Sequence, residues 1–282
     1  MEAPKVYLIS ATPNPRAILK LCWEIITSPG FPQNYQAHDI TELGGDLTYT
    51  EPSFDPNTPE SDKIVEEFLK SGLGGPLEMI NFVFAFEGVT RAFTHQMVRT
   101  RLASYMQQSQ RFTNFEDGLV IRTPSRVLNH KQKTEDGSTA EEVWGSAIDA
   151  IDWACKQLKA MGVATEDLRG LYPTNVTTNI VQAIDFNALR HLLHHRLCTQ
   201  AQQEEWGSVA KQIKKIVTDY DPLLGEALVP ACAEKGKCDF NTTLDRPCQR
   251  RDSLPVKVSK SKLHSLSDKT GLSVDEILKE IQ

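Results

Sequence analysis

The residues best suited to chemistry lie in one basic segment, 87–112, which reads EGVTRAFTHQMVRTRLASYMQQSQRF. It holds four arginines and His95, while Glu87 is its only acid. Arginine offers a planar fork of donors to a dianion, and serine and glutamine add neutral hydrogen bonds. The segment therefore indicates a site for a phosphorylated ligand. An ordinary solvated basic face has the same composition and stays open as the alternative at this point.

The elements around this segment must position its cations. In a helix, Arg91, His95 and Arg99 stack on one face, because they recur every four residues. After Leu102 the chain is rich in serine and glutamine and poor in apolar anchors, which predicts a donor-rich loop. Before the segment, residues 80–86 alternate between apolar and smaller side chains, the pattern of a strand with one apolar face. A strand, a helix and a loop would thus present the basic residues.

In the rest of the chain, apolar residues recur with the period of a helix in some segments and the period of a strand in others. These periods predict strands near 6–10, 119–122 and 175–182, and helices near 15–25, 60–71, 139–158, 165–169 and 186–217. We expect an α+β fold, a central twisted sheet packed with helices. Residues 29–58 are irregular, and the last thirty residues change character. The predicted division is a catalytic domain over 1–250 and a small helical C-terminal appendage over 251–282.

Composition narrows the class of partner. The chain has 282 residues, a net charge of −6 and 40% hydrophobic residues, as in ordinary globular domains. Broad nucleic-acid binding would need an excess of lysine and arginine, so none is expected. No apolar run reaches the length of a membrane span, and the N-terminus lacks the order of a signal peptide. With six cysteines and no export signal, we expect a cytoplasmic protein without a membrane partner.

A second constellation is a set of four cysteines, Cys198, Cys232, Cys238 and Cys248. Four thiolates can close a structural zinc site, but these spacings are looser than paired Cys-x-x-Cys, and reduced cysteines in a loop are the alternative. His191 and His195 share a helix face, yet no HExxH glutamate separates them, so we expect hydrogen-bonding roles. Neither a Rossmann glycine motif nor a phosphate-binding P-loop is present in the sequence.

The basic segment is similar to a known signature. Arg99-Thr100-Arg101, then seven residues, then Ser109 resembles the Arg-His-Arg-x7-Ser motif of flavin-dependent thymidylate synthases, the ThyX family, except for the threonine. The flanking stretches 87–96 and 104–112 resemble the approach helix and substrate loop of that family. The resemblance extends from about Val6 to Cys248.

This resemblance implies a homotetramer that methylates dUMP at C5 of the uracil. Methylenetetrahydrofolate would supply the carbon, reduced FAD the hydride, and NADPH the reducing power. Arg196 and Ser109 are implied as catalytic residues; a fixed cation at Arg196 would favour negative charge on the ring and so activate C5. For Arg169 and Arg196 the alternative is an ordinary helix ion pair. The implied nucleotide contacts are Gln96, Arg99, Gln107, Ser109, Gln110, Arg111, Arg169 and Arg196, with Arg111 on the phosphate.

The implied flavin contacts depart further from the family pattern. They are Glu78, Arg99, Thr100, Arg101, Asn187 and His191. Thr100 stands where the family has histidine, and Asp185-Phe186-Asn187 stands where it has Asn-Ala-Arg. Because the flavin pyrophosphate is anionic, losing cations and gaining Asp185 predicts weaker binding of FAD, an altered pose or altered chemistry. Two alternatives therefore remain: a folate-dependent hydroxymethylase of a pyrimidine nucleotide, and a nucleotide-binding homologue without catalysis.

Overall fold

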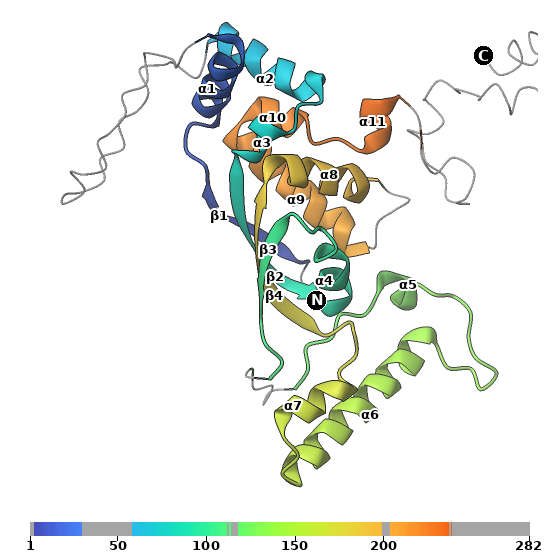
Figure 1. The fold of residues 1–282 in the computed structure, drawn as a ribbon. Helices are drawn as coiled ribbons and strands as arrows, with labels where there is room; N and C mark the ends of the chain where they lie inside the picture. Colours follow the sequence, from blue (N-terminus) through green and yellow to red (C-terminus); the bar gives the residue numbers. More distant parts are fainter. Residues whose placement is uncertain are drawn as a thin grey trace, which may run out of the picture.

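A four-stranded antiparallel sheet forms the centre of the molecule (Figure 1). The computed structural model describes residues 3–29, 58–111, 113, 118–198, 204–236 and 238. The strand order is β1-β2-β4-β3. The strands are β1 (Lys5–Ala11), β2 (Asn81–Thr90), β3 (Ala103–Gln107) and β4 (Thr177–Asp185). The predicted α+β fold is thus confirmed, and so are the strands expected near 6–10, 80–86 and 175–182.

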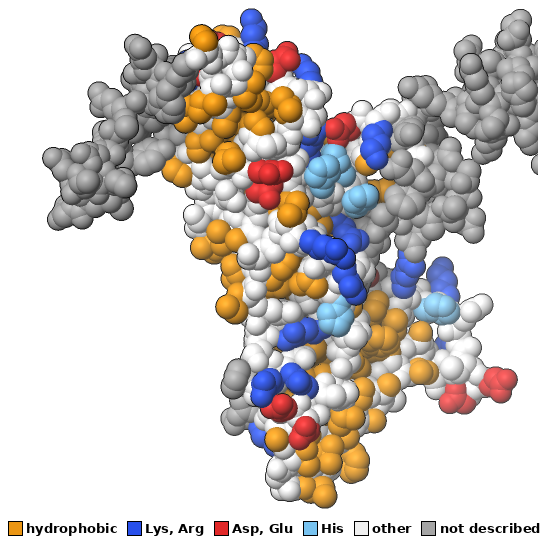
Figure 2. All heavy atoms as spheres, in the orientation of Figure 1, with side chains coloured by type: hydrophobic (Ala, Val, Ile, Leu, Met, Phe, Trp, Pro, Cys, Tyr) orange, Lys and Arg blue, Asp and Glu red, His pale blue; other side chains and the backbone are white. Residues whose placement is uncertain are grey.

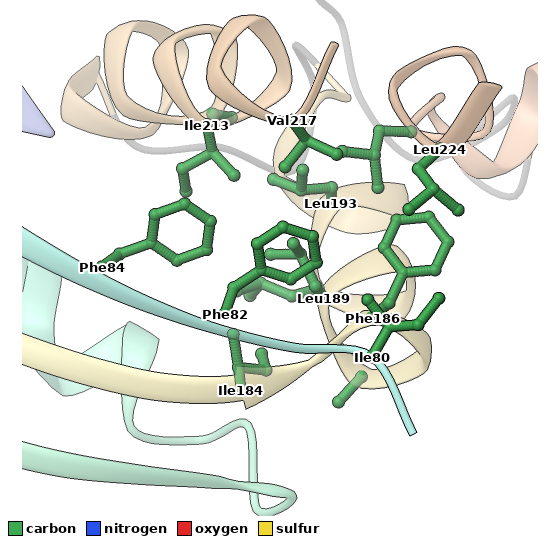
Figure 3. Close-up of a cluster of buried hydrophobic side chains, with 14 of the residues drawn as sticks. Ile80, Phe82, Phe84, Ile184, Phe186, Leu189, Leu193, Ile213, Val217 and Leu224 are labelled. Atoms are coloured by element: carbon green, nitrogen blue, oxygen red, sulfur yellow. The ribbon is translucent and has the colours of Figure 1, made fainter. Parts of the chain in front are cut away.

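One face of the sheet carries the hydrophobic core. Phe82 and Phe84 of β2, both fully buried, point toward the helices α8 (Phe186–Arg196), α9 (Glu204–Tyr220) and α10 (Pro222–Glu226) (Figure 3). The alternation predicted for β2 is confirmed, since Phe82, Phe84 and Phe86 are buried between less buried neighbours. Fully burying one such ring contributes about 1.5–3 kcal/mol, so this layer fixes the sheet against its helices.

Three further helices close one end of this layer. They are α1 (Pro15–Thr27), α2 (Pro59–Ser71) and α3 (Gly75–Glu78). Gly72 follows α2 with a left-handed φ of 74°, a conformation that glycine adopts without steric penalty, and so ends the helix.

The opposite face of the sheet leaves large apolar side chains exposed. Met106 is 76% exposed, and the register places Tyr7 and Val181 on the same face of the sheet. Ile9, 61% exposed, lies at the register shift between Leu8 and Ser10. A hollow of about 490 Å³ on this face is lined in part by Tyr7, Met106 and Val181. Alternation in the strands places these residues opposite the core, so this face is available for a further layer.

A helical arm projects away from the sheet (Figure 1). It comprises α5 (Ser125–Leu128), α6 (Ala140–Ala160), α7 (Thr165–Leu168) and the 3-10 turn Arg169–Leu171. Thr139 caps α6 in a capping box with Glu142. No side chain of α6, which the structure describes along its whole length, is buried, and Val143 is 50% exposed. The described residues of one chain therefore cover the apolar side chains of this helix at most in part.

Several sequence predictions are wrong around the basic segment. Helix α4 (Arg91–Met97) ends before Arg99, so Arg99 lies in a turn and not on the helix face of Arg91 and His95. The expected loop after Leu102 begins with β3, because Ala103–Gln107 pairs with β4. The stretch 119–122 makes only an isolated bridge, Ile121 to Val176. The long helical region 186–217 is two helices, α8 and α9.

Two predictions fall outside the described residues. Most of the irregular stretch 29–58 and all of the appendage 251–282 lie outside the described residues. The division of the chain at residue 250 therefore remains a prediction. Helix α11 (Ala231–Lys235) is the last element described. Among the helices that the structure describes, none combines the length and the apolar character needed to cross a membrane.

Candidate active site

Helix α4 begins at a distortion in β2. The pairing of β2 with β4 shifts between Phe86 and Val89, and Gly88 there has a φ of 67° that favours glycine. Thr90 then caps α4 by accepting a hydrogen bond from Phe93 N at 3.1 Å. The bulge and the cap together convert a core strand into a helix that crosses the end of the sheet.

A buried carboxylate holds the start of α4. Glu205 of α9, 6% exposed, accepts hydrogen bonds from Thr90 N at 2.9 Å and from the Thr90 hydroxyl. Burial raises the pKa of Glu205, and the hydrogen bonds from Thr90 and the Arg122 guanidinium, 3.7 Å away, oppose that rise. The sequence analysis did not identify Glu205. Its signal is weak, because an acid in the first turn of a helix is common.

The C-terminal half of α4 meets Arg196, the predicted catalytic residue at the end of α8. Arg196 Nη1 donates to Gln96 Oε1 at 3.0 Å, and its Cζ lies 4.9 Å from the centroid of the Trp206 ring. Burial lowers the pKa of Arg196, as expected for a cation partly withdrawn from water. Gln96 and Arg196 are 100 residues apart in sequence, and the fold brings these two predicted nucleotide contacts together. Trp206 was missed, since its spacing marks only a core position.

Strand β3 is fastened to α4 by two side chains. Gln107 Nε2 donates to Thr94 Oγ1 at 2.9 Å, and Arg91 Nη2 donates to the carbonyl of Gln108. Gln107 is a predicted nucleotide contact whose side-chain amide is engaged inside the chain. The hydrogen bond to Gln108 ties Arg91 of the basic segment to the backbone just after β3, and burial lowers the pKa of its guanidinium.

The predicted flavin residues gather near the start of α8. Asn187 Nδ2 donates to Glu78 Oε1 at 3.1 Å, and His191 lies one turn further along α8. Arg99 and Arg101 are exposed in the turn before β3, and Ala103 pairs with Ile184, two residues before α8. The register therefore places this turn beside the same helix end. A Cβ on Gly74 would lie 2.5 Å from the Asn187 side chain, so glycine permits this close approach.

Asp185 has a structural role at this helix end. Its side chain accepts a hydrogen bond from Ala188 N at 2.8 Å and so caps α8. Thr100 lies in the turn between Arg99 and Arg101 and is partly exposed. Neither observation tests the strength of flavin binding, which remains a prediction.

A second group of predicted nucleotide residues lies where β3 leads toward α7. Ser109 Oγ accepts a hydrogen bond from Arg111 N at 3.1 Å. Arg111 donates to Glu166 Oε2 from Nε at 3.0 Å and from Nη2 at 2.6 Å. Arg169 follows Glu166 by three residues and is exposed, while Gln110 is partly exposed. The predicted phosphate ligand Arg111 thus holds a carboxylate that sequence reasoning did not identify.

Two groups of predicted residues result within one chain. Gln96, Arg99 and Arg196 lie about the ends of α4 and α8, and Ser109, Arg111 and Arg169 lie near α7. Figure 2 shows basic side chains and histidines running from α8 past α4 toward α7 on one face of the molecule. The hollow on the open sheet face is lined by Gln107 but by none of these arginines. Convergence of both groups on one nucleotide remains a prediction.

The predicted zinc site finds no support in the part of the chain that is described. There, no group of three or more histidine, cysteine or acidic side chains is arranged to hold a metal ion. Cys198, Cys232 and Cys238 are partly buried, and Cys248 lies outside the described residues. Nε2 of His194 in α8 instead lies 2.5 Å from Oε2 of Glu234 in α11, and burial lowers the pKa of His194. Zinc therefore remains an untested prediction.

The fold and the basic face define an α+β protein with a surface that suits an anionic ligand. Comparison with known proteins makes the assignment: residues 7–223 match the family described as thymidylate synthase complementing protein, and the chain belongs to that family.

Curated relatives align with this chain over most of their own length. A flavin-dependent thymidylate synthase of Clostridium tetani is 29% identical over 248 residues, covering 83% of this chain and 90% of the relative. One from Nitratidesulfovibrio vulgaris is 32% identical over 202 residues, covering 71% and 77%. Another from Thermococcus kodakarensis is 33% identical over 203 residues, covering 68% and 79%.

Proposed function

We propose that this protein catalyses the flavin-dependent methylation of dUMP to dTMP. The single observation that carries the proposal is the match of residues 7–223 to the family, whose curated relatives in bacteria and archaea bear that enzyme name. Neither alternative, a hydroxymethylase or a homologue without catalysis, is favoured by those names.

The geometry supports a division of labour within the nucleotide site. Arg111 and Arg169 near α7 would bind the phosphate, because guanidinium forks match its oxygens. Arg196 would lie against the uracil, where Gln96 and Trp206 fix its plane. A cation held in place before reaction stabilises charge that develops on the ring without further reorganisation. Ser109, already turned toward Arg111 N, would complete the phosphate end.

The residues beside α8 fit a flavin. Two exposed arginines, Arg99 and Arg101, suit its pyrophosphate, and Asn187 with Glu78 offers an amide and a carboxylate for hydrogen bonds. When bound, FAD would supply the hydride. Thr100 and Asp185 still predict weaker binding than in relatives with a histidine and an asparagine there. NADPH and methylenetetrahydrofolate rest on the resemblance alone.

A homotetramer would explain two exposed apolar surfaces. The face of α6 around Val143 and the sheet face around Met106 both lack cover within the described part of one chain. Figure 2 shows hydrophobic side chains gathered over the region of α6 and α7. Neighbouring copies packed on these surfaces would also allow the α7 group of one chain to complete the α8 group of another. Light scattering on the purified protein tests this: a mass near that of a single 31.6 kDa chain would contradict it.

Product analysis tests the reaction. The purified protein is incubated with dUMP, methylenetetrahydrofolate, NADPH and FAD, and the nucleotide is analysed by mass spectrometry. We expect dTMP. A product heavier by one oxygen would indicate hydroxymethylation, and dUMP binding without conversion would indicate a homologue that lacks catalysis. An absorbance spectrum of the protein as purified tests the flavin prediction separately, because tight stoichiometric FAD would contradict weak binding.

A further inference from the structure

The hydroxyl of Tyr105 joins two carbonyls on either side of Arg99. It lies 2.9 Å from the Met97 carbonyl oxygen and 3.0 Å from that of Thr100, within donating distance of both. Met97 is the last residue of α4, and its carbonyl also accepts from Thr100 N at 3.1 Å. The tyrosine ring packs against the hydrophobic core from β3. A side chain anchored in the core thus holds the backbone of the turn that carries Arg99.

Gln182 directs this hydroxyl. It pairs directly with Tyr105 across β3 and β4, and its Nε2 donates to the hydroxyl oxygen at 3.2 Å. Because Gln182 donates, the single proton of the hydroxyl is left for the two carbonyls. Desolvation raises the pKa of Tyr105, which keeps that proton in place.

The burial of Gln182 is otherwise unfavourable. Its position in β4 lies between Ile180 and Ile184, where the alternation calls for an apolar side chain, and it is fully buried. Its Oε1 is buried without a hydrogen-bond partner among the residues that the structure describes. A buried polar atom left unsatisfied destabilises a fold and requires an explanation. Orientation of the Tyr105 hydroxyl by the other end of the amide provides one.

We propose that Tyr105, oriented by Gln182, is a positioning residue that fixes the turn at residues 98–102 and so presents Arg99 and Arg101 to the anionic flavin. This inference rests on the proposed function for the identity of the ligand. The side chains of Arg99 and Arg101 are exposed, so their ordering on binding depends on the backbone beneath them. A fixed backbone lowers the entropy lost when long side chains are ordered by a ligand.

The test is Tyr105→Phe, which removes only the hydroxyl and keeps the ring in the core. Tyr7→Phe is the matched control: its hydroxyl donates to Glu87 at 2.6 Å on the opposite face of the sheet. The full-length proteins are compared by amide hydrogen exchange without ligand and by FAD binding, followed through flavin fluorescence. In Tyr105→Phe we expect faster exchange confined to residues 98–102, and a Kd for FAD raised about five- to tenfold, the effect of losing one ordinary hydrogen bond or slightly more. The control should change neither.

The outcomes separate this inference from the proposed function. Unchanged exchange at 98–102 overturns the positioning role whatever the enzyme does. Faster exchange with an unchanged Kd for FAD also overturns it, because the turn would then serve packing alone. A wild type that binds FAD but makes no dTMP refutes the proposed function, while the ratio of the two Kd values still decides the role of Tyr105. A wild type that does not bind FAD overturns both. If Tyr105→Phe is unstable, Gln182→Met provides the same comparison without loss of the tyrosine.

Discussion

Replacing Glu166 by glutamine should strengthen binding of the nucleotide. Glu166 accepts hydrogen bonds from both Nε and Nη2 of Arg111, the predicted phosphate ligand. A phosphate bound by Arg111 must displace this carboxylate or lie beside it, and like charges repel. Glu166→Gln removes the negative charge and leaves Arg111 in place.

The size of the effect follows from the exposure of the pair. The two side chains are 50% and 49% exposed, so the ion pair is worth about 0.5–1 kcal/mol in water with salt. Removing this ion pair between Arg111 and Glu166 corresponds to a decrease of about two- to fivefold in the KM for dUMP. Because the pair competes with binding and not with the chemical step, kcat should stay unchanged.

Steady-state kinetics over a range of dUMP concentrations, repeated at low and high salt, provide the measurement. Asp167→Asn is the matched control, since it removes the same charge from the next residue of α7, which does not contact Arg111 in the described hydrogen bonds. We expect the control to leave the KM within experimental error. A higher or unchanged KM in Glu166→Gln would refute the view that the carboxylate competes with phosphate at Arg111.

Three further predictions concern the site and the assembly. Arg196→Lys keeps the charge but loses the planar fork of donors and its stacking on Trp206, so kcat/KM should fall about 10- to 100-fold. The control Arg190→Lys on the same helix should leave kcat/KM nearly unchanged, and equal losses in both variants would argue against a special role for Arg196. Burial raises the pKa of Glu205, so the stability that its protonated form contributes is complete below the ordinary pKa of 4.5 and is lost as pH rises through the folded-state pKa. Thermal melts should therefore show Glu205→Gln becoming more stable relative to the wild type as pH increases. A difference in melting temperature that does not change with pH would contradict this. Val143→Asp on α6 should reduce the particle mass in light scattering without lowering secondary structure, whereas an intact assembly would show that this face is not an interface.

Local patterns predicted much of the fold. The alternation through Phe82, Phe84 and Phe86 predicted β2, and the helical period over 139–158 predicted α6. These features are predictable because neighbours in sequence decide them, through a period of two in a strand or of 3.6 in a helix.

Other features depend on partners far away in the chain. Strand β3 is short and lies among serines and glutamines, and its pairing with β4 across about eighty positions decides its conformation. Arg99 leaves the helix because α4 ends at Met97, where the chain turns toward that strand. Side chains of α6 stay partly or fully exposed among the described residues, and no local pattern in the helix indicates what would cover them.

In the candidate site, too, some residues could be predicted from the sequence and their distant partners could not. The resemblance to a family supplied Gln96 and Arg196, and the fold brings them into contact. It gave no indication of Trp206, Glu166 or Glu205, which act on those residues or on their helix. Partners of this kind need no fixed spacing from the motif, so only coordinates identify them.

The brevity of α4 has a consequence for how this chain can vary. Within seven residues and its cap, the helix contacts α9 through Thr90, β3 through Thr94 and α8 through Gln96, and Arg91 contacts the residue after β3. One inserted residue would rotate everything beyond it by about 100°, and the downstream contacts would face the wrong neighbours. Loops elsewhere can lengthen at small entropic expense. We therefore expect natural variants to differ in length around this helix and to keep its residue count constant.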